Sequence, residues 1–142
     1  MTVLTLELAT RMIAAGFAHA RTEGLRPMAM VVLDTGGAPI AFQREDGAAP
    51  GRYNLAHGKA YGTAMLQLPG RAQAALSERF PVLMGAANGV FGGAFVPVPG
   101  GVLVRDADGA VLGSVGVSGG MPEDDASVAI AGIEAVSLTA EA

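Results

Sequence analysis

The chain has 142 residues, a length that suits one domain with a buried core, and we expect a single domain over residues 1–142. Hydrophobic residues make up 51% of the sequence, charged residues only 15%, and 21 positions are glycine. Because a domain this apolar must cover part of its surface by association, the composition predicts a homo-oligomer. The net charge of −4 and nine scattered basic residues exclude nucleic acid as an expected partner.

The sequence also contains no cysteine and no pattern typical of a secretory signal or a membrane span. Without cysteine there can be no disulfide, thiolate nucleophile or cysteine metal site. The N-terminus lacks a basic region followed by an apolar core, so we expect no secretory signal and a cytoplasmic location. Residues 85–104 are uncharged but contain six glycines and two prolines, whose backbone could not stay hydrogen-bonded in lipid, so we expect no membrane span.

The first third of the chain predicts a helix followed by a β-hairpin. Residues 5–23 have apolar positions at helical spacing, with Thr5 as the cap and Gly24 as the stop. Residues 28–34 and 39–44 predict two strands, and Gly36 and Gly37 between them are expected to supply positive φ angles.

The remaining elements predict a helical middle and a strand-rich end. A helix is expected at 50–66, a short one at 71–79, and one or two further turns at 81–89. Three strands at 94–98, 102–105 and 111–117 and a last helix at 123–138 complete the order. Strands joined by tight hairpins pair antiparallel, so the fold class is α/β in the α+β sense: about five antiparallel strands with helices packed on them.

Residues 44–65 hold most of the side chains able to do chemistry. Tyr53, His57 and Tyr61 fall at positions i, i+4 and i+8 of the expected helix, so their rings form one stripe. A neighbouring stripe of small residues, Ala56, Ala60, Thr63 and Ala64, would let the helix lie close to the sheet. The aromatic stripe would then border a cleft beside the 50–66 helix.

His57 has three interpretations: a haem iron ligand, a general base, or a packed helix histidine. His19 is the rival histidine, and its place near the end of the first helix also suits a cation at the helix C-terminus. Tyr53 and Tyr61 can stack on a flat ligand, donate a hydrogen bond, or simply pack.

Two cations flank this stripe in sequence. Lys59 and Arg44 can each hold a carboxylate, such as a haem propionate or an organic acid. The alternative is a surface ion pair with Glu45 or Asp46.

Glycine-rich segments provide further candidate ligand contacts. Gly116–Gly120, which includes Ser118 and Gly119, leads from a strand into a helix and can present N–H groups to an anion. Asp125 is expected to cap that helix. Gly100 and Gly101 predict a tight turn that lets the strand cross beneath the 50–66 helix, and their backbone can also line the cleft.

Several motifs in this order resemble one known family. They are REDGA at 44–48, GKA at 58–60, VPVPGGVLVRDADG at 96–109, GVSG at 116–119 and Asp125 before an alanine-rich helix. The chain is similar over nearly its whole length to the GlcG/HbpS-like proteins, which include the C-terminal domain of PduO-type cobalamin adenosyltransferases. This resemblance implies a profilin-like αβα sandwich, commonly oligomeric, with members that bind haem and some that degrade it. The axial haem ligand is not part of the shared motifs, so His57 is a feature of this sequence alone.

Three hypotheses for function follow. The first is a haem-binding, and in one alternative haem-degrading, protein whose macrocycle lies in an apolar cleft or a subunit interface beside the 50–66 helix, with propionates near Lys59 or Arg44. The second is a cofactor-free isomerase, decarboxylase or lyase acting on an organic acid, with His57 as base, Lys59 or Arg44 as anchor, and a tyrosine such as Tyr53 or a backbone N–H group stabilising the oxyanion. The third is an oligomeric binding module without catalysis.

Overall fold

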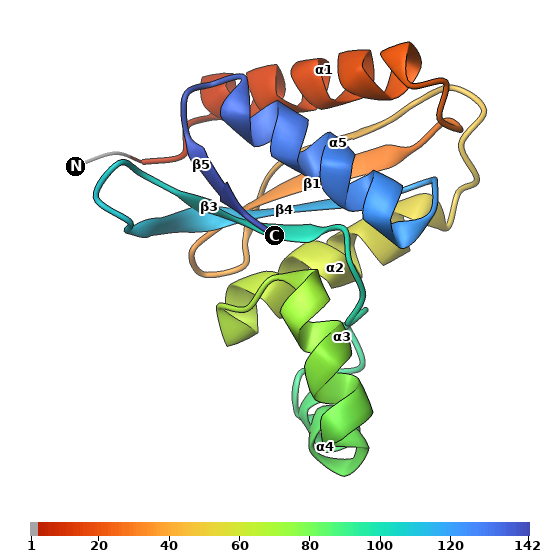
Figure 1. Ribbon diagram of the computed structural model, residues 1–142, viewed down its shortest axis with the longest axis vertical. Helices are drawn as coiled ribbons and strands as arrows, with labels where there is room; N and C mark the ends of the chain where they lie inside the picture. Colours follow the sequence, from red (N-terminus) through yellow and green to blue (C-terminus); the bar gives the residue numbers. More distant parts are fainter. Residues whose placement is uncertain (1–2) are drawn as a thin grey trace.

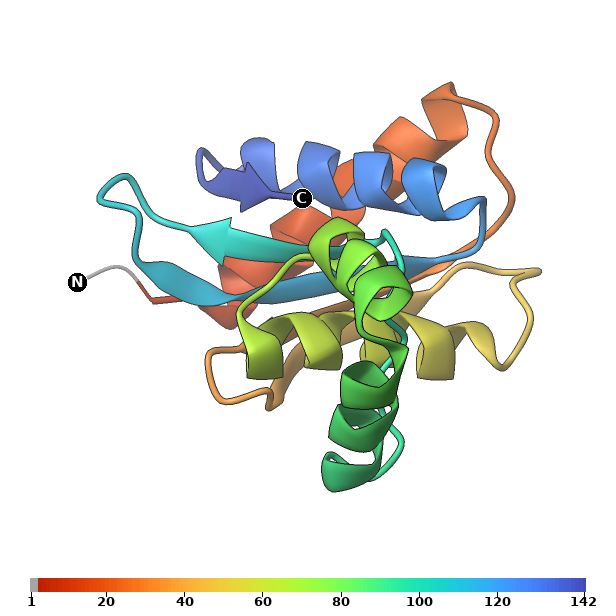
Figure 2. The ribbon, with the colours of Figure 1, turned by 60° about the horizontal axis from the view of Figure 1, so that its bottom comes forward.

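A five-stranded antiparallel sheet with the strand order β2-β1-β4-β3-β5 separates two layers of helices (Figures 1 and 2). The computed structural model describes residues 3–142, so the first two residues of the N-terminal segment considered above lie outside it. The strands are β1 (Ala29–Asp34), β2 (Pro39–Arg44), β3 (Gly101–Arg105), β4 (Val111–Ser118) and β5 (Thr139–Glu141). The helices are α1 (Leu6–Thr22), α2 (Arg52–Leu66), α3 (Gly70–Arg79), α4 (Pro81–Val90) and α5 (Pro122–Glu134).

The layers confirm the predicted α+β sandwich. α1 and α5 cover one face of the sheet, α2 crosses the other, and α3 and α4 form an arm that projects from the body (Figures 1 and 2). The main apolar core lies under α1 and α5, and a smaller one lies between α2 and β1. None of the helices in residues 3–142 combines the length and the apolar character that a bilayer crossing requires.

The first helix and the first hairpin follow the predicted local rules, with one difference. Thr5 accepts a hydrogen bond from the Leu8 amide at 3.2 Å, and Gly24 ends α1 with a φ of 67°. In the hairpin turn only Gly37 has a positive φ, 82°. Gly36 has none: the Asp34 carboxylate accepts hydrogen bonds from the Gly36 and Ala38 amides, and backbone hydrogen bonds between Asp34 and Ala38 and between Gly37 and Asp34 also close the turn.

The predicted strand at 94–98 is wrong. These residues run beside α2, where the Val96 amide donates to the Gly58 carbonyl at 3.3 Å and the Phe95 amide donates to Asn88 Oδ1 at 2.9 Å. Pro97 and Pro99 lack the amide protons that a ladder needs. The fifth strand is instead β5, which pairs with β3, so the last helix ends at Glu134 rather than at residue 138.

The helix α2 lies unusually close to the sheet. A Cβ atom built on Gly116 of β4 would lie 2.0 Å from the Ala56 carbonyl oxygen and 2.9 Å from Ala60 Cβ. Gly101 of β3 comes equally near, since its Cβ would meet Thr63 Oγ1 at 2.3 Å. The stripe of small side chains therefore faces the sheet as predicted, which leaves the aromatic stripe on the outer side of α2.

Candidate functional site

Six aromatic and imidazole rings form a continuous row along the outer side of α2, which we call the aromatic ladder. The His57 ring stacks between Tyr53 and Tyr61, with centroid distances of 5.9 and 5.6 Å. Phe42 of β2 meets Tyr53 edge-on at 4.6 Å at one end. At the other end Tyr61 contacts Phe91 and Phe95, whose own rings stack at 4.9 Å. The predicted i, i+4, i+8 stripe is therefore confirmed as a geometric feature.

Two hollows meet at Tyr53. The larger, the β2–α2 cleft, has a volume of about 790 Å³ and is open to solvent. It is lined by Val31, Pro39, Phe42, Gln43, Arg44, Pro50 and Tyr53. The smaller, the His57 hollow, has a volume of about 290 Å³ and is lined by Tyr53, Asn54, Leu55, His57, Gly93, Ala94 and Val96. A flat ligand lying over Tyr53 can thus contact both hollows.

The two histidines differ in whether a ring nitrogen lies within hydrogen-bond distance of another side chain. His19, near the end of α1, lies with Nε2 3.1 Å from Ser127 Oγ of α5, on the opposite face of the sheet from α2. His57 is half-buried, and within residues 3–142 its ring makes aromatic contacts rather than side-chain hydrogen bonds. Among the same residues no group of three or more histidine, aspartate and glutamate side chains is arranged to hold a metal ion. His57 is therefore the imidazole that faces a hollow.

Lys59 does not join the aromatic ladder. Its side chain is 5% exposed and its Nζ lies 2.8 Å from Asp125 Oδ2, while Asp125 is 1% exposed. The pair joins α2 to the start of α5 across the end of the sheet. Asp125 also accepts a 2.8 Å hydrogen bond from the Gly120 amide, so it anchors the turn before α5 and makes no capping bond at the helix start. Neither Glu45 nor Asp46 is the partner of Lys59.

The glycine-rich segments predicted to contact a ligand lie inside the protein instead, and Gly100 and Gly101 lie against Lys59. Gly100 has a φ of 120°, and a Cβ there would lie 2.8 Å from Lys59 Cδ, so the predicted close crossing beneath α2 is present. Ser118 is 1% exposed and accepts a 3.2 Å hydrogen bond from Arg52 Nη1. Gly119 is buried against Met28, where a Cβ would come within 2.3 Å. The structure thus places Gly100, Gly101, Ser118 and Gly119 away from the aromatic ladder.

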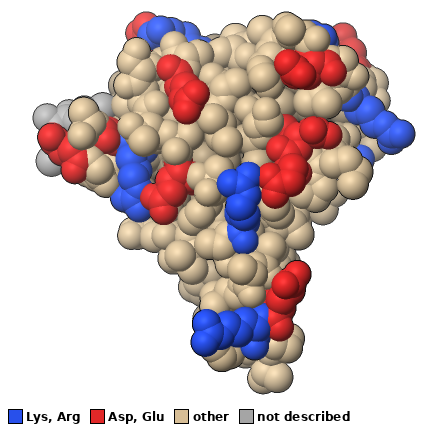
Figure 3. Space-filling model, in the orientation of Figure 1, with Lys and Arg blue, Asp and Glu red and all other residues tan. Residues whose placement is uncertain are grey.

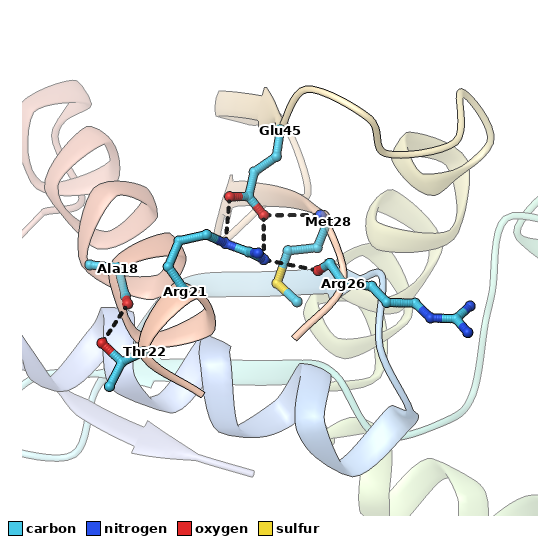
Figure 4. Close-up of polar contacts among 6 residues, drawn as sticks. All are labelled: Ala18, Arg21, Thr22, Arg26, Met28 and Glu45. Atoms are coloured by element: carbon cyan, nitrogen blue, oxygen red, sulfur yellow. Dashed lines mark hydrogen bonds and ion pairs between the residues drawn. The ribbon is translucent and has the colours of Figure 1, made fainter. Parts of the chain in front are cut away.

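Arg44 is the cation that remains beside the ladder. It is exposed, lines the β2–α2 cleft, and has no ion pair within residues 3–142. Its neighbour Glu45 is engaged elsewhere: both carboxylate oxygens lie 3.1 Å from the Arg21 guanidinium, and Oε1 also accepts from the Met28 amide (Figure 4). Glu45 therefore ties α1 to the start of β1 and leaves Arg44 available to a ligand.

Sequence reasoning missed three members of this region. Phe42 belongs to the predicted hairpin, and only the packing of β2 beside α2 brings its ring to Tyr53. Phe95 lies in the segment predicted as a strand at 94–98 and Phe91 lies just before it, so the contact of these two rings with α2 was not predicted. Alternation of apolar residues was the available signal, but it does not distinguish a strand from an extended segment packed on a helix.

The fold and the ladder define a class: an α+β sandwich protein whose outer helix carries a row of stacked aromatic and imidazole rings beside an open cleft. A family model described as "Haem degrading protein HbpS-like" matches residues 4–134. The chain therefore belongs to the HbpS-like family, which confirms the resemblance seen in the sequence. No curated protein matches the chain.

Solved structures with the same fold agree with this placement. A double mutant of HbpS from Streptomyces reticuli is 30% identical, with a TM-score of 0.80 over 94% of this chain and 87% of that one. ORFY of Klebsiella pneumoniae is 27% identical, with a TM-score of 0.83 over 96% of this chain and 92% of that one. A PduOC–heme complex has a TM-score of 0.85 at 21% identity, over 96% of this chain and 97% of that one, a likeness of fold alone.

Proposed function

We propose that this protein binds haem on the aromatic ladder of α2, with the macrocycle over the β2–α2 cleft and His57 as the iron ligand. The observation that carries the proposal is the half-buried His57 imidazole, stacked between two tyrosine rings and facing a hollow that adjoins the cleft. Membership of a haem-degrading family and the haem bound by the PduOC relative support the same ligand.

The residues present fit a porphyrin in three respects. The cleft volume of about 790 Å³ lies within the range of small-molecule sites, about 300–1,000 Å³. Phe42 and Tyr53 offer ring surfaces that suit stacking on a flat apolar ligand. Arg44 at the cleft presents a planar pair of donors that matches a propionate carboxylate. When bound, haem supplies an iron centre that accepts a neutral imidazole nitrogen.

The chain's own residues then have distinct tasks. The two tyrosines hold the His57 ring in one orientation, and stacking removes most of its freedom to rotate. The small inner side of α2 fixes the helix against the sheet, so the ladder is held in place before a ligand arrives. Arg44 orients the ligand by its charge.

The proton-transfer enzyme needs a general base and a carboxylate anchor on one surface. Lys59 is buried with Asp125 on the other side of α2, so Arg44 is the anchor that this second hypothesis retains. The family membership, rather than the geometry, favours haem binding over it. Haem degradation by this chain would also need a reductant and an oxidant, and the aromatic ladder itself supports binding of the macrocycle only.

The test is a hemin titration of the purified protein, followed by absorption spectroscopy. We expect a saturable Soret band at one equivalent per site, its loss or displacement in His57→Ala, and its retention in the matched control His19→Ala. Arg44→Ala should weaken binding by roughly fivefold, the equivalent of about 1 kcal/mol for an exposed charge pair.

Each outcome of the titration bears on a different part of the proposal. Broadening without saturation in wild type would overturn haem binding altogether. A spectrum that survives in His57→Ala and disappears in His19→Ala would keep haem binding but overturn the site on α2. An Arg44→Ala variant with wild-type affinity would remove that residue from propionate recognition.

We also propose that the protein self-associates. The structure leaves large apolar side chains exposed, among them Val82, Val90 and Met121, which are 85%, 79% and 70% accessible. Exposed apolar surface on this scale favours association, as the composition predicted. Sedimentation velocity of haem-free protein tests it, and a single monomeric species across the micromolar range would contradict it.

A further inference from the structure

The aromatic ladder has easily oxidised rings only at its centre. The chain contains two tyrosines, no tryptophan and no cysteine, and both tyrosines stack on His57. The rings at the two ends of the ladder are phenylalanines: Phe42 at one end, Phe91 and Phe95 at the other. A phenol gives up an electron and its hydroxyl proton to a strong oxidant, whereas an unsubstituted benzene ring resists this. The only two phenols of the sequence therefore flank one imidazole.

Stacking does not require the hydroxyl groups of these two tyrosines. Phenylalanine rings provide the stacking and edge contacts elsewhere in the ladder, and they would serve equally well here. Tyr53 is 37% exposed and Tyr61 is partly exposed, so a proton released by either ring can pass to water. The two phenols thus have both the contact and the solvent access that loss of an electron together with a proton requires.

We propose that Tyr53 and Tyr61 donate electrons, through the stacked His57 ring, to hydrogen peroxide reacting at the bound haem. This inference rests on the proposed haem site and gives its two tyrosines a redox role. The ring centroids lie 5.9 and 5.6 Å from that of His57, with interplanar angles of 30° and 17°. Both phenols therefore face the imidazole that would bind the iron, and rings stacked in this way can pass an electron directly.

The reaction balances with one electron from each tyrosine. Hydrogen peroxide takes up two electrons and two protons, its O–O bond breaks, and two molecules of water form. Tyr53 and Tyr61 each lose one electron and the hydroxyl proton, so each O–H bond breaks and each ring becomes a neutral phenoxyl radical. The iron ends in the oxidation state in which it began.

A small neutral oxidant suits this site better than a charged redox protein. On the face seen in Figure 3 acidic and basic side chains are interspersed, and no field of one sign extends across that face. A field of one sign is what steers a charged partner to a protein surface. Hydrogen peroxide carries no charge and needs no steering, and the β2–α2 cleft that meets the ladder at Tyr53 is open to solvent.

The expected consequence is protection of the macrocycle. An oxidising equivalent that passes to a tyrosine is no longer available to attack the porphyrin, so the protein controls which competing reaction occurs. Met65 is a possible competitor at this end of α2, because a Cβ built on Gly37 would meet both Met65 Cε, at 2.7 Å, and Tyr61 Cε2, at 3.3 Å. A thioether would instead be converted to the sulfoxide, which mass spectrometry distinguishes from an oxidised tyrosine.

The test uses purified protein loaded with one equivalent of hemin, mixed with hydrogen peroxide and frozen for electron paramagnetic resonance. We expect an organic radical whose hyperfine pattern changes when the protein carries ring-deuterated tyrosine. Tyr53→Phe and Tyr61→Phe should each keep the radical of the remaining tyrosine, and the double variant should lose the signal. The double variant should keep the wild-type Soret band and hemin affinity, because phenylalanine preserves the stack, yet its Soret band should bleach faster in excess peroxide. The control Met65→Leu should retain the radical.

The possible results separate this inference from haem binding itself. A wild-type protein that binds no hemin overturns both. Hemin binding followed by neither a tyrosyl radical nor a tyrosine oxidation product in mass spectra overturns the redox role and leaves haem binding standing. Loss of the whole signal in one single variant would overturn the part of the other tyrosine. Equal bleaching rates in wild type and the double variant would overturn the protection of the macrocycle, and sulfoxide at Met65 in place of tyrosine oxidation would overturn the assignment of the donors.

Discussion

Replacing Lys59 by methionine is the most demanding test of the interior of this protein. The Lys59–Asp125 pair is nearly inaccessible to water, and the substitution leaves the Asp125 carboxylate with one remaining hydrogen bond, from the Gly120 amide. Removing one partner of a buried ion pair typically costs about 3–5 kcal/mol, out of a total stability of about 5–15 kcal/mol. For a domain of this size we expect the thermal midpoint to fall by roughly 10–15 °C.

The assay is thermal and urea unfolding followed by circular dichroism. Arg71→Met is the control, because it breaks a solvent-exposed pair with Glu123 and should lower the unfolding midpoints far less than Lys59→Met. The double variant Lys59→Met/Asp125→Asn removes both charges and should recover much of the loss, since the introduced amide oxygen can still accept from the Gly120 amide. A Lys59→Met protein within about 1 kcal/mol of wild type would refute the buried pair. Hemin binding of the folded fraction should be unchanged, since Lys59 is not on the ladder.

Two further predictions concern packing and pH. Gly116→Ala should destabilise the protein by about 3 kcal/mol, because its Cβ would meet the Ala56 carbonyl at 2.0 Å. The control Gly51→Ala should be nearly neutral, because a Cβ there meets no atom within 4 Å, and equal urea midpoints for the two variants would contradict this packing. The hydrogen bond from Arg71 lowers the pKa of Glu123. The stabilisation from this pair is therefore present above the ordinary glutamate pKa and is lost as the pH falls through the lowered value. In an NMR titration Arg71→Gln should raise the pKa of Glu123, and an unchanged titration curve would disprove the contact.

Local sequence patterns predicted most helices and strands, but they did not predict the position of segment 94–98 or the short strand β5. The antiparallel direction of the hairpin strands was predicted because the turns 35–38 and 106–110 carry strong local signals, whereas the number of strands agrees only because the wrong strand at 94–98 offsets the missed β5. The segment 94–98 has the same apolar alternation as a strand, and its true position depends on the Gly58 carbonyl, which is distant in sequence. β5 was missed for the opposite reason, because three residues are too few for a periodic signal.

The candidate site shows the same division. The stripe of Tyr53, His57 and Tyr61 follows from helical geometry alone, so the sequence was sufficient for it. Lys59 was placed with that stripe by proximity in sequence, although a rotation of about 200° along the helix separates it from His57. Its real partner, Asp125, is 66 residues away, and nothing local to either residue indicates the pairing.

The contrast between the two sides of α2 has a consequence for ligand affinity. A binding surface that must be ordered by its ligand loses part of the interaction energy to that ordering. On α2 the inner side is locked by backbone contacts with Gly101 and Gly116, and the outer rings are held by one another. If the proposed ligand binds there, the conformational entropy of the ladder would be lost during folding rather than on binding, which would favour affinity.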